Sequence, residues 1–283
     1  MFYEILNKKY DKIIILPNFY YFSSILAFFF LPKNKRILWG IDLDRGLIVN
    51  KLRLIFAKKA NSIIQYNKRD LSKLLNNNIK RDKIFISNNT LHVENHMNTS
   101  KMNKSSFVYV GRLQARKKIK ILFYAFQSII NKIPKNINLE IVGDGLIKDK
   151  LILIAKNLNI SERVIFHGKI TNDKKLIKIF SRSFAYISPD AIGLGLQHSF
   201  SYGVPVITCK NGFKGPEFFH LINLENSILF DDEADLSRIL IEIVENKIDV
   251  KKISDNSYNY FLKNLSIQNM FNQFNKAINY DNM

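Results

Sequence analysis

Short runs of apolar, often β-branched residues alternate with longer amphipathic stretches along almost the whole chain of 283 residues. The short runs are typical of buried strands, and the longer stretches follow the 3.6-residue period of helices. A helix that connects two neighbouring strands carries the chain back along a face of the sheet, so the two strands run parallel. The sequence therefore predicts an α/β protein with parallel sheets that are covered by helices.

The first part of the chain offers few strands. They are expected at residues 12–16, 36–39, 62–66 and 83–87, with helices at residues 19–31, 50–59 and 68–77. Residues 88–105 are rich in Asn, Ser, Lys and Met and lack a hydrophobic period, which is typical of a connection between domains. We therefore predict a reduced N-terminal Rossmann-like domain over residues 1–90 and a linker over residues 91–105.

The second part continues the alternation with more strands. They are expected at residues 107–110, 138–142, 163–167, 184–188, 204–208 and 227–230. Helices are expected to begin at residues 118, 173, 194 and 234. A further helix is expected between the strand at residues 138–142 and residue 157. This order predicts a doubly wound domain over residues 106–249. Residues 250–283 are predicted to form a closing helix and tail.

The chain is strongly basic, with 43 Lys and Arg against 24 Asp and Glu and a formal net charge of +19. Such an excess is typical of proteins that meet nucleic acid, an anionic membrane or phosphorylated small molecules. A second explanation is AT-rich coding DNA, since Asn, Lys and Ile are frequent throughout. No basic run is interleaved with aromatic residues, and no Cys/His finger is present, so we expect no nucleic-acid partner.

Metal and disulfide chemistry have little support in the sequence. Cys209 is the only cysteine, which excludes a disulfide within the chain and a cysteine-based metal site and fits a reducing cytoplasm. His92 and His96 are four residues apart, but they lie in the polar connection, where we expect solvated side chains. We therefore predict no metal site.

One apolar stretch, from Ile13 to Leu31, has lysines on both sides. Pro17 and Asn18 interrupt it, so a strand followed by a helix is favoured over a membrane span. No small-x-small cleavage site follows it, which argues against an export signal. We expect this segment to dock on an anionic membrane surface.

Ligands of open α/β sheets bind beyond the carboxyl ends of the strands, where glycines let the backbone approach a phosphate. One such strand end runs from Gly111 through Arg112 to Lys117, so that clustered cations precede a helix. Arginine and lysine side chains neutralise the charges of a diphosphate. A solvated basic surface is the alternative.

Two further strand ends have suitable residues. In the first, Asp190 precedes Gly193, Gly195 and His198 at the start of a helix, and a carboxylate there can accept hydrogen bonds from sugar hydroxyls. Capping of the helix by Asp190 is the alternative. In the second, a buried strand is followed by a glycine-punctuated turn that ends at Glu217.

In this order, the pieces resemble the donor domain of the retaining GT-B glycosyltransferases, the group called family 4 or glycosyl transferases group 1. The family's G-R-L-x-x-x-K motif is similar to residues 111–117, its V-G-D/E-G strand end to residues 142–145, and its F-x-G element to residues 166–168. Its E-G-F-G-L-x-x-x-E-A segment aligns with residues 190–199, its G-x-P-V-I strand with residues 203–207, and its G-x-P-E turn with residues 215–217.

The chain departs from that pattern at two positions. Asp190 replaces the first glutamate, which contacts the donor sugar in the family, and His198 replaces the second, which contacts the nucleotide ribose. An imidazole can still hydrogen-bond to ribose hydroxyls. A branch of the family with the pattern G-L-x-x-x-H-S-x-x-Y/F-G is similar to residues 193–203, and this likeness makes His198 a feature of that branch.

The resemblance covers residues 10–245 and implies a GT-B fold of two Rossmann-like domains. The N-terminal, acceptor-side domain is truncated by its first strands, and the C-terminal domain is the nucleotide-sugar-binding one. It implies catalytic roles for Arg112, Lys117 and Asp190. Donor binding is implied for seven residues, which are Gly111, Gly168, Gly193, Leu194, Gly195, His198 and Glu217. Trp39 and Asp42 end a strand and are expected on the acceptor side, with a turn-forming role as the alternative for Asp42.

We accordingly expect a retaining, metal-independent hexosyltransferase that needs no cofactor. Its donor is a nucleoside diphosphate sugar, and its acceptor is a glycan or lipid-linked glycan of bacterial surface polysaccharide or lipopolysaccharide synthesis, in the cytoplasm or at the inner face of the membrane. Without a metal, Arg112, Lys117 and the N–H groups from Gly193 to Leu196 meet the charge of the leaving group. The alternative is a non-catalytic nucleotide-sugar-binding or scaffold protein that keeps the donor fold.

Overall fold

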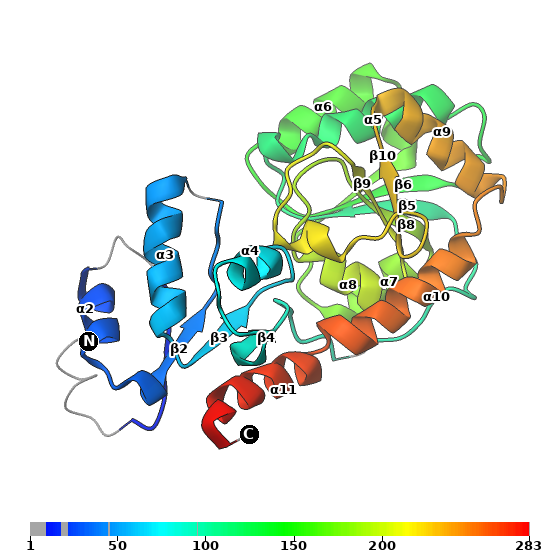
Figure 1. Cartoon of the computed structure of the whole chain (residues 1–283). Helices are drawn as coiled ribbons and strands as arrows, with labels where there is room; N and C mark the ends of the chain where they lie inside the picture. The colour runs from blue at the N-terminus through cyan, green and yellow to red at the C-terminus, as the bar shows by residue number, and fades with distance from the viewer. Residues whose placement is uncertain (1–9, 18–21, 45, 95, 283) are drawn as a thin grey trace. The chain divides into compact units, whose positions relative to one another are not determined.

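The computed structural model describes residues 10–17, 22–44, 46–94 and 96–282. The chain divides into two compact units (Figure 1). Unit 1 comprises Met1–Asn89 with Ile267–Met283, and unit 2 comprises Thr90–Ser266. Each unit holds a parallel sheet with helices against it, which confirms the predicted α/β class. None of the helices in the described ranges is long and apolar enough to cross a membrane.

The sheet of unit 1 has its four strands in chain order, all parallel. They are β1 (Ile13–Ile15), β2 (Arg36–Trp39), β3 (Ser62–Gln65) and β4 (Ile84–Ile86). The connecting helices are α2 (Phe22–Phe30), α3 (Leu47–Lys59) and α4 (Leu71–Asn76), with 3-10 turns at Lys33–Lys35 and Arg81–Lys83. Since crossovers are right-handed, a sheet that grows in one direction collects its connecting helices on one face. Phe28, Phe56 and Leu74 from these helices share a core with Leu38 and Ile63.

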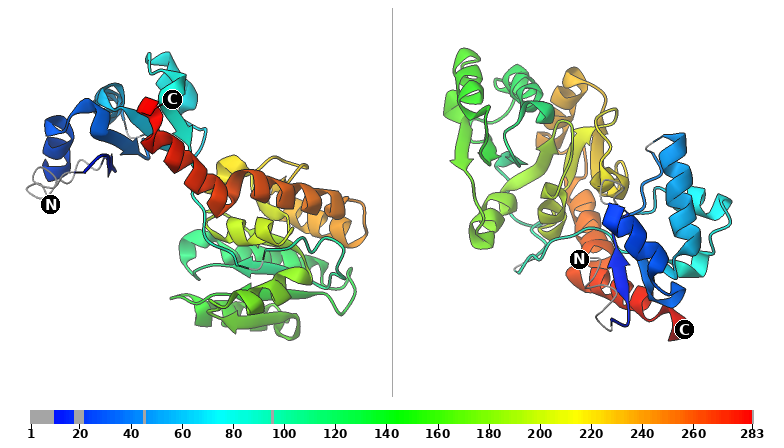
Figure 2. Two further views of the ribbon diagram at one scale, coloured as in Figure 1. Left: turned by 90° about the horizontal axis from the view of Figure 1, so that it is seen from below. Right: turned by 90° about the vertical axis from the view of Figure 1, so that its left-hand side faces the viewer.

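The other face of this sheet is covered by the end of the chain. Ile37, Ile64 and Phe85 point to that face and form a cluster with Ala277 of helix α11 (Ile267–Ile278). The hydroxyl of Ser62 donates to the Ala277 carbonyl at 2.7 Å. Figure 2 shows α11 beside the strands of unit 1, and its residues contact β3 and β4. The helix thus completes a sheet that its own crossovers cover on one side only.

The sheet of unit 2 has the strand order β10-β9-β8-β5-β6-β7, and all its pairs are parallel. The strands are β5 (Ser106–Val110), β6 (Asn138–Val142), β7 (Val164–Gly168), β8 (Ser183–Ser188), β9 (Val206–Cys209) and β10 (Ser227–Phe230). From β5 the chain adds strands on one side and then crosses to add the rest on the other. This is the predicted doubly wound order, and its switch point lies between β5 and β8.

Helices lie on both faces of this second sheet (Figure 1). One side has α5 (Ile119–Ile129), α6 (Lys148–Asn157) and α9 (Glu233–Val244). The other has α7 (Asp173–Ser181), α8 (Gly195–Ser201) and α10 (Val250–Tyr260). Shorter 3-10 turns occupy Ala115–Lys117, Ser161–Arg163, Pro216–His220 and Tyr280–Asn282. Each face has its own apolar core, with Phe126 central on the first and Phe180 on the second.

Residues 91–105, predicted as a linker, lie along unit 2. The Met97 and Thr99 amides donate to the carbonyls of Ser201 and Tyr202, both at 3.0 Å, at the end of α8. The hydroxyl of Ser100 bonds to the carboxylate of Asp255 in α10 at 2.6 Å. These contacts hold the segment on the surface of the donor-type sheet.

The tail after residue 250, predicted as one closing helix, forms two. Helix α10 continues into a π-helical turn at Phe261–Leu265, and Ser266 then adopts an extended conformation before α11 begins. Helix α10 belongs to unit 2 and α11 to unit 1. The π-turn and Ser266 therefore mark the second crossing of the chain between units.

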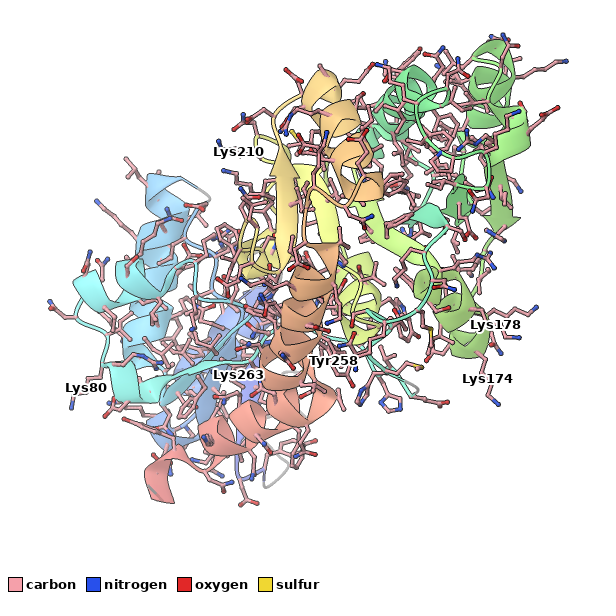
Figure 3. All side chains as sticks on the ribbon, turned by 90° about the vertical axis from the view of Figure 1, so that its right-hand side faces the viewer. Lys80, Lys174, Lys178, Lys210, Tyr258 and Lys263 are labelled. Carbon is pink, nitrogen blue, oxygen red and sulfur yellow. The ribbon has the colours of Figure 1, made fainter. Side chains whose placement is uncertain are left out.

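The lysines are distributed over the surface. Figure 3 shows Lys174 and Lys178 of α7 pointing outward from unit 2, which also contains Lys210 after β9 and Lys263 of the π-turn. Lys80 points outward from unit 1. All five are exposed, so much of the positive charge is spread and solvated.

Candidate functional site at the switch point

At the carboxyl edge of the unit 2 sheet, the backbone segments that follow β5, β6 and β7 lie very close to one another. The Gly111 amide donates to the Val142 carbonyl at 3.0 Å, and the Gly143 amide donates to the Gly168 carbonyl at 2.8 Å. A Cβ on Gly143 would lie 1.9 Å from the Gly111 carbonyl oxygen, and the φ of Gly143 is +142°. Only glycine fits such a contact. The strand ends therefore form a backbone-lined ledge, as the V-G-D-G sequence predicts.

Lys117 connects the two sides of the switch point. It ends the 3-10 turn after β5, and its Nζ donates to the carbonyl of Ala191 in the loop after β8. Burial, followed by the neighbouring charge of Arg116, lowers the pKa of Lys117, while Glu217 and Asp190 oppose that shift. The ammonium group also lies 3.8 Å from the position of a Cβ at Gly193. A half-buried cation thus sits between the first two predicted phosphate-binding loops.

Lys118 and Asp190 form an ion pair, with 2.9 Å between Nζ and Oδ2. Lys118 has a φ of +49°, a left-handed conformation that is costly for a residue with a Cβ and recurs at functional sites. Lys118 was not among the predicted site residues, because no residue pattern indicates this backbone conformation. The signal that the sequence did contain was the cation pair at positions 117 and 118.

The carboxylate of Asp190 is 8% exposed and accepts a hydrogen bond from the Phe213 amide at 2.6 Å. Burial acts to raise the pKa of Asp190, but the Phe213 amide and Lys118 outweigh it and hold the pKa below its usual value. Asp190 does not cap α8, whose N-cap residue is Leu194. The alternative capping role is therefore wrong, and the ionised carboxylate belongs to the carboxyl edge.

Arg112 and Glu217 complete this edge. The Arg112 side chain is exposed, and its carbonyl accepts a hydrogen bond from the Tyr109 hydroxyl at 3.1 Å. Glu217 lies in the 3-10 turn Pro216–His220 after β9, is 8% exposed, and raises the pKa of Lys117 through its charge. The structure thus brings Lys117, Asp190 and Glu217 together and leaves Arg112 exposed on the first loop.

The loop from Gly193 to Leu196 differs from the expectation of four available N–H groups. The Leu196 amide donates to the Gly193 carbonyl at 3.0 Å. This hydrogen bond closes the turn that begins α8, so that amide is not available to a phosphate. Leu194 has a 44% exposed side chain, and Gly195 follows it as the first residue of α8.

His198 lies in the middle of α8. Its ring stacks on Tyr202 with 6.3 Å between centroids, and burial lowers its pKa. Within the described part of the chain, its Nδ1 and the Tyr202 hydroxyl are buried and have no hydrogen-bond partner. The Nδ1 position of His198 is therefore unused but enclosed, and the structure does not show it open to a ribose hydroxyl.

His167 occupies a structural position beside the site. Its Nε2 lies 2.8 Å from the carboxylate of Glu140 on β6, which is 1% exposed and also binds Arg182. The buried carboxylate is satisfied by this network. His167 is therefore a packed residue at the end of β7.

The two acceptor-side residues lie in unit 1. Trp39 packs its ring against Tyr66 and Phe274, with centroids 5.6 and 5.3 Å away. Asp42 accepts a hydrogen bond from the Asp44 amide at 3.0 Å and pairs with Arg69 at 2.6 Å. Trp39 thus packs within unit 1, and Asp42 has the turn-forming contact that was the alternative reading.

No group of three or more His, Cys, Asp or Glu side chains suits a metal ion within the described ranges. His96 of the predicted solvated pair lies 3.2 Å from the Tyr258 hydroxyl through its Nδ1.

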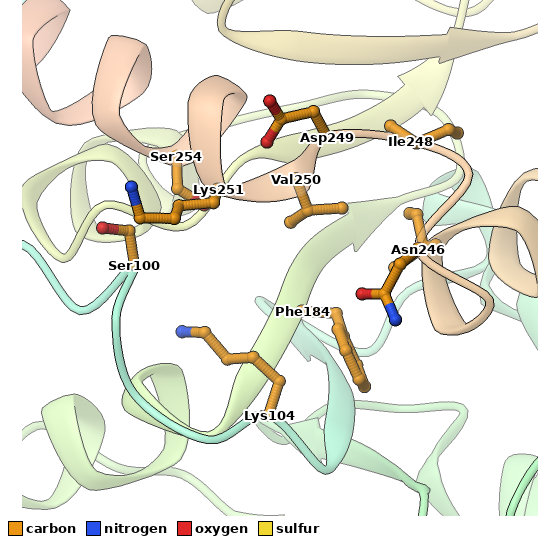
Figure 4. Close-up of a pocket in the computed structure, with 10 residues that line it drawn as sticks. Ser100, Lys104, Phe184, Asn246, Ile248, Asp249, Val250, Lys251 and Ser254 are labelled. Carbon is orange, nitrogen blue, oxygen red and sulfur yellow. The ribbon is translucent and has the colours of Figure 1, made fainter.

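A cavity of about 280 Å³ lies elsewhere in unit 2 (Figure 4). Lys104, which precedes β5, and Phe184, at the start of β8, line it together with the first turn of α10. Burial lowers the pKa of Lys104 to about 8. Because the amino ends of the strands border this cavity, it is distinct from the switch-point site.

Known proteins resemble this chain in sequence and in fold. The family described as Glycosyl transferases group 1 matches residues 94–260, more than half of the chain. N-acetyl-alpha-D-glucosaminyl L-malate synthase of Bacillus anthracis is 27% identical over 105 residues, which are 37% of this chain and 27% of the synthase. The chain thus aligns with only about a quarter of that relative.

Two solved structures share the fold over nearly the whole chain. The lipopolysaccharide outer core galactosyltransferase WaaB is 18% identical, with a TM-score of 0.70 over 99% of this chain and 78% of WaaB. A mutant of TarM from S. aureus, solved in a complex that contains UDP and alpha-GlcNAc-glycerol, is 17% identical. Its TM-score is 0.66 over 98% of this chain and 58% of TarM. Both show the GT-B type of fold that the motifs predict.

Proposed function

The chain belongs to the glycosyl transferases group 1, and from this premise we propose that it transfers a hexose from a nucleoside diphosphate sugar to a glycan or lipid-linked glycan. One observation carries the proposal. Lys117 bridges the loops after β5 and β8, beside the ionised Asp190, at the switch point where doubly wound sheets bind nucleotides.

The charges at this edge suit two parts of a sugar nucleotide, its diphosphate and its sugar. Lys117 and the exposed Arg112 offer cations to the diphosphate, which carries the charge that develops as the bond to the sugar breaks. Asp190 and Glu217 offer acceptors to sugar hydroxyls. We propose that diphosphate binding displaces the Lys117 ammonium from the Ala191 carbonyl, since a phosphate oxygen is the stronger acceptor.

The finer features of the reaction follow from the family pattern. We propose that transfer retains the configuration at the sugar carbon and needs no metal ion, with Arg112 and Lys117 stabilising the leaving diphosphate. We propose uridine diphosphate as the leaving group, because TarM was solved with UDP. We propose an acceptor among bacterial surface glycans, because WaaB is a lipopolysaccharide outer core galactosyltransferase. We also propose that the chain acts in the cytoplasm or at the inner face of the membrane.

A thermal-shift panel with UDP, GDP, ADP and dTDP tests the donor site without knowledge of the acceptor. We expect UDP to raise the melting temperature of the chain by several degrees, because a ligand that binds only the folded state stabilises it. Arg112→Ala and Lys117→Ala should each abolish most of that shift, and Arg81→Ala in unit 1 serves as the control. If no nucleotide shifts a cooperative melt, the donor-site assignment fails.

A scaffold protein that keeps the donor fold would also bind UDP. The release of UDP from UDP-glucose, UDP-galactose and UDP-GlcNAc, in the presence of bacterial membrane glycolipids, separates the two functions. Turnover that Asp190→Asn lowers by about a hundredfold or more supports the transferase. Nucleotide binding without turnover on any of these donors would favour the scaffold.

A further inference from the structure

Lys118 has a backbone conformation that is costly for a residue with a side chain. Its φ is +49° and its ψ is +32°, and it is the N-cap residue of helix α5. In this left-handed region the Cβ approaches the following carbonyl oxygen, so glycine is favoured. Asn78, Asn159 and Asn246 also have positive φ, but each follows the C-cap residue of a helix, where asparagine recurs. Lys118 has no such reason for its conformation.

The side chain of Lys118 reaches the carboxylate of Asp190. Its Nζ lies 2.9 Å from Oδ2 of Asp190, in the loop after β8. The other oxygen, Oδ1, accepts a hydrogen bond from the Phe213 amide in the loop after β9, at 2.6 Å. The latter loop is so close that a Cβ on Gly212 would lie 2.7 Å from Oδ1. Asp190 is thus held by one group at each oxygen, and Lys118 is one of the two.

This arrangement keeps the Asp190 carboxylate charged and leaves it able to bind a ligand. Burial acts to raise the pKa of Asp190, whereas the Phe213 amide, Lys118 and the charge of Lys117 lower it. Each carboxylate oxygen has two lone pairs. Within the described ranges, each Asp190 oxygen has one of the contacts above, so a second acceptor position remains for a sugar hydroxyl. A charged acceptor forms a stronger hydrogen bond with that hydroxyl than a neutral one.

The stability of the fold does not explain Lys118. Its side chain is 55% exposed, and an ion pair with so exposed a partner contributes little to folding. The left-handed backbone of a residue with a Cβ acts against folding. A glycine at this position would remove the strain and lose only a weak ion pair. Conformations of this kind recur at functional sites, and here the strained residue contacts a carboxylate of the carboxyl edge.

We propose that Lys118 is a positioning residue for the donor sugar, because it holds the Asp190 carboxylate charged and in place for the sugar hydroxyls. The inference rests on the proposed function, in which Asp190 meets the sugar and Arg112 and Lys117 meet the diphosphate. Lys118 acts through Asp190 and does not contact the sugar. Its loss should therefore weaken the binding of a sugar nucleotide and leave the binding of the free nucleoside diphosphate unchanged.

Three replacements separate the cation from the backbone. Lys118→Gly and Lys118→Ala both remove the ammonium group, but only alanine keeps a Cβ in the left-handed region. Lys118→Arg keeps a cation. Titration calorimetry measures the dissociation constants of UDP, UDP-glucose, UDP-galactose and UDP-GlcNAc, and thermal melts measure the stability of each variant.

We expect sugar binding to follow the cation and stability to follow the Cβ. The dissociation constant of the UDP-sugar that the parent chain binds best should rise about tenfold in Lys118→Gly and Lys118→Ala, while that of UDP stays within about twofold. Lys118→Arg should stay within about threefold for both ligands. Lys118→Gly should melt about 1 to 3 °C above Lys118→Ala. A residue that serves stability alone would not separate these two measurements.

The pH dependence of binding gives a further measurement. Without Lys118, Asp190 loses one of the groups that lower its pKa, so its carboxylate takes up a proton at a higher pH. As the solution is acidified, the affinity of Lys118→Gly for the UDP-sugar should therefore begin to fall at a higher pH than that of the parent chain.

Two matched controls lie in the same unit. Lys120→Ala removes an exposed cation of α5, and Asn159→Gly changes an exposed residue with a φ of +54°. Both variants should keep the parental affinities and the parental pH dependence, because neither residue contacts Asp190.

The possible outcomes distinguish this inference from the proposed function. An equal loss of affinity for UDP and for the UDP-sugar in Lys118→Gly would make Lys118 a further cation for the diphosphate and overturn the positioning role. Unchanged sugar binding in both Lys118→Gly and Lys118→Ala would overturn it as well. A parent chain that binds no nucleotide would refute the donor site itself, and both the proposed function and this inference would fail.

Discussion

His220 is an example of a side chain whose environment gives it a measurable pH dependence. It is 4% exposed at the end of the 3-10 turn that contains Glu217, and its Nδ1 lies 3.2 Å from the Tyr260 hydroxyl. Burial lowers the pKa of His220 to about 4, because the imidazolium would lose its hydration there. The unfolded chain has no such penalty, so its histidine titrates near the ordinary value.

This difference predicts that unit 2 loses stability in acid. As pH falls from about 6.5 to about 4, the unfolded state binds a proton at His220 that the folded state does not bind. The loss of unfolding free energy over that window is on the order of 3 kcal/mol. In His220→Gln, urea unfolding measured between pH 7 and pH 4.5 should show a shallower decline. The exposed His92→Gln should keep the parental slope, and an equal slope in both variants would contradict the assignment.

Some site residues could be predicted from the sequence pattern, and others depend on their environment in the fold. Gly111, Lys117 and Asp190 were identified from their order after predicted strands, and the structure places them at the carboxyl edge of the sheet. Lys118 was not identified, because its ion pair depends on a positive φ and on Asp190, a residue in a distant loop. Their roles in transfer remain predictions.

Helix α11 stabilises a sheet far from it in the sequence. Its Phe274 packs on Trp39 of β2, and Ala277 is fully buried beside Ile37 and Ile64. Phe271 on the same helix is 62% exposed. Replacing either phenylalanine by alanine changes the helix propensity by the same amount, but only Phe274 packs on the sheet. The two replacements therefore form a matched pair.

We expect Phe274→Ala to lower the unfolding free energy of unit 1 by about 1 to 3 kcal/mol and Phe271→Ala by less than about 0.5 kcal/mol. Trp39 is the only tryptophan of the chain and lies in unit 1, so its fluorescence reports this unit during urea unfolding. If both changes destabilise unit 1 equally, the packing of α11 on the sheet is not the cause.

The two units have separate apolar cores, and the proposed nucleotide site lies within unit 2. A ligand stabilises only the unit whose folded state binds it. We therefore predict that UDP at about a hundredfold excess over its dissociation constant raises the unfolding free energy of unit 2 by about 3 kcal/mol and leaves unit 1 unchanged.

Two probes distinguish the units in one experiment. Far-ultraviolet circular dichroism follows both units, and Trp39 fluorescence follows unit 1. With UDP, the later part of the dichroism transition should move while the fluorescence transition stays in place. A fluorescence transition that moves by the same amount would mean that the two units unfold as one.

Local pattern was sufficient for the element types, because strand and helix periods are properties of neighbouring residues. The strands at residues 36–39, 138–142 and 227–230 begin and end where the sequence predicts. The parallel order and the glycine-rich strand ends followed from the same alternation. The motifs were also sufficient to identify the family, since their order is visible in the sequence without any knowledge of contacts.

Contacts between distant segments were decided only in the folded structure. Two examples are the return of α11 to unit 1 and the pairing of Lys118 with Asp190, and each depends on which surface meets which. Burial, ion pairing and the shifts of pKa that result arise from neighbours in space. A linear pattern records the period of a helix, but the packing of the sheet determines which side of that helix remains in water.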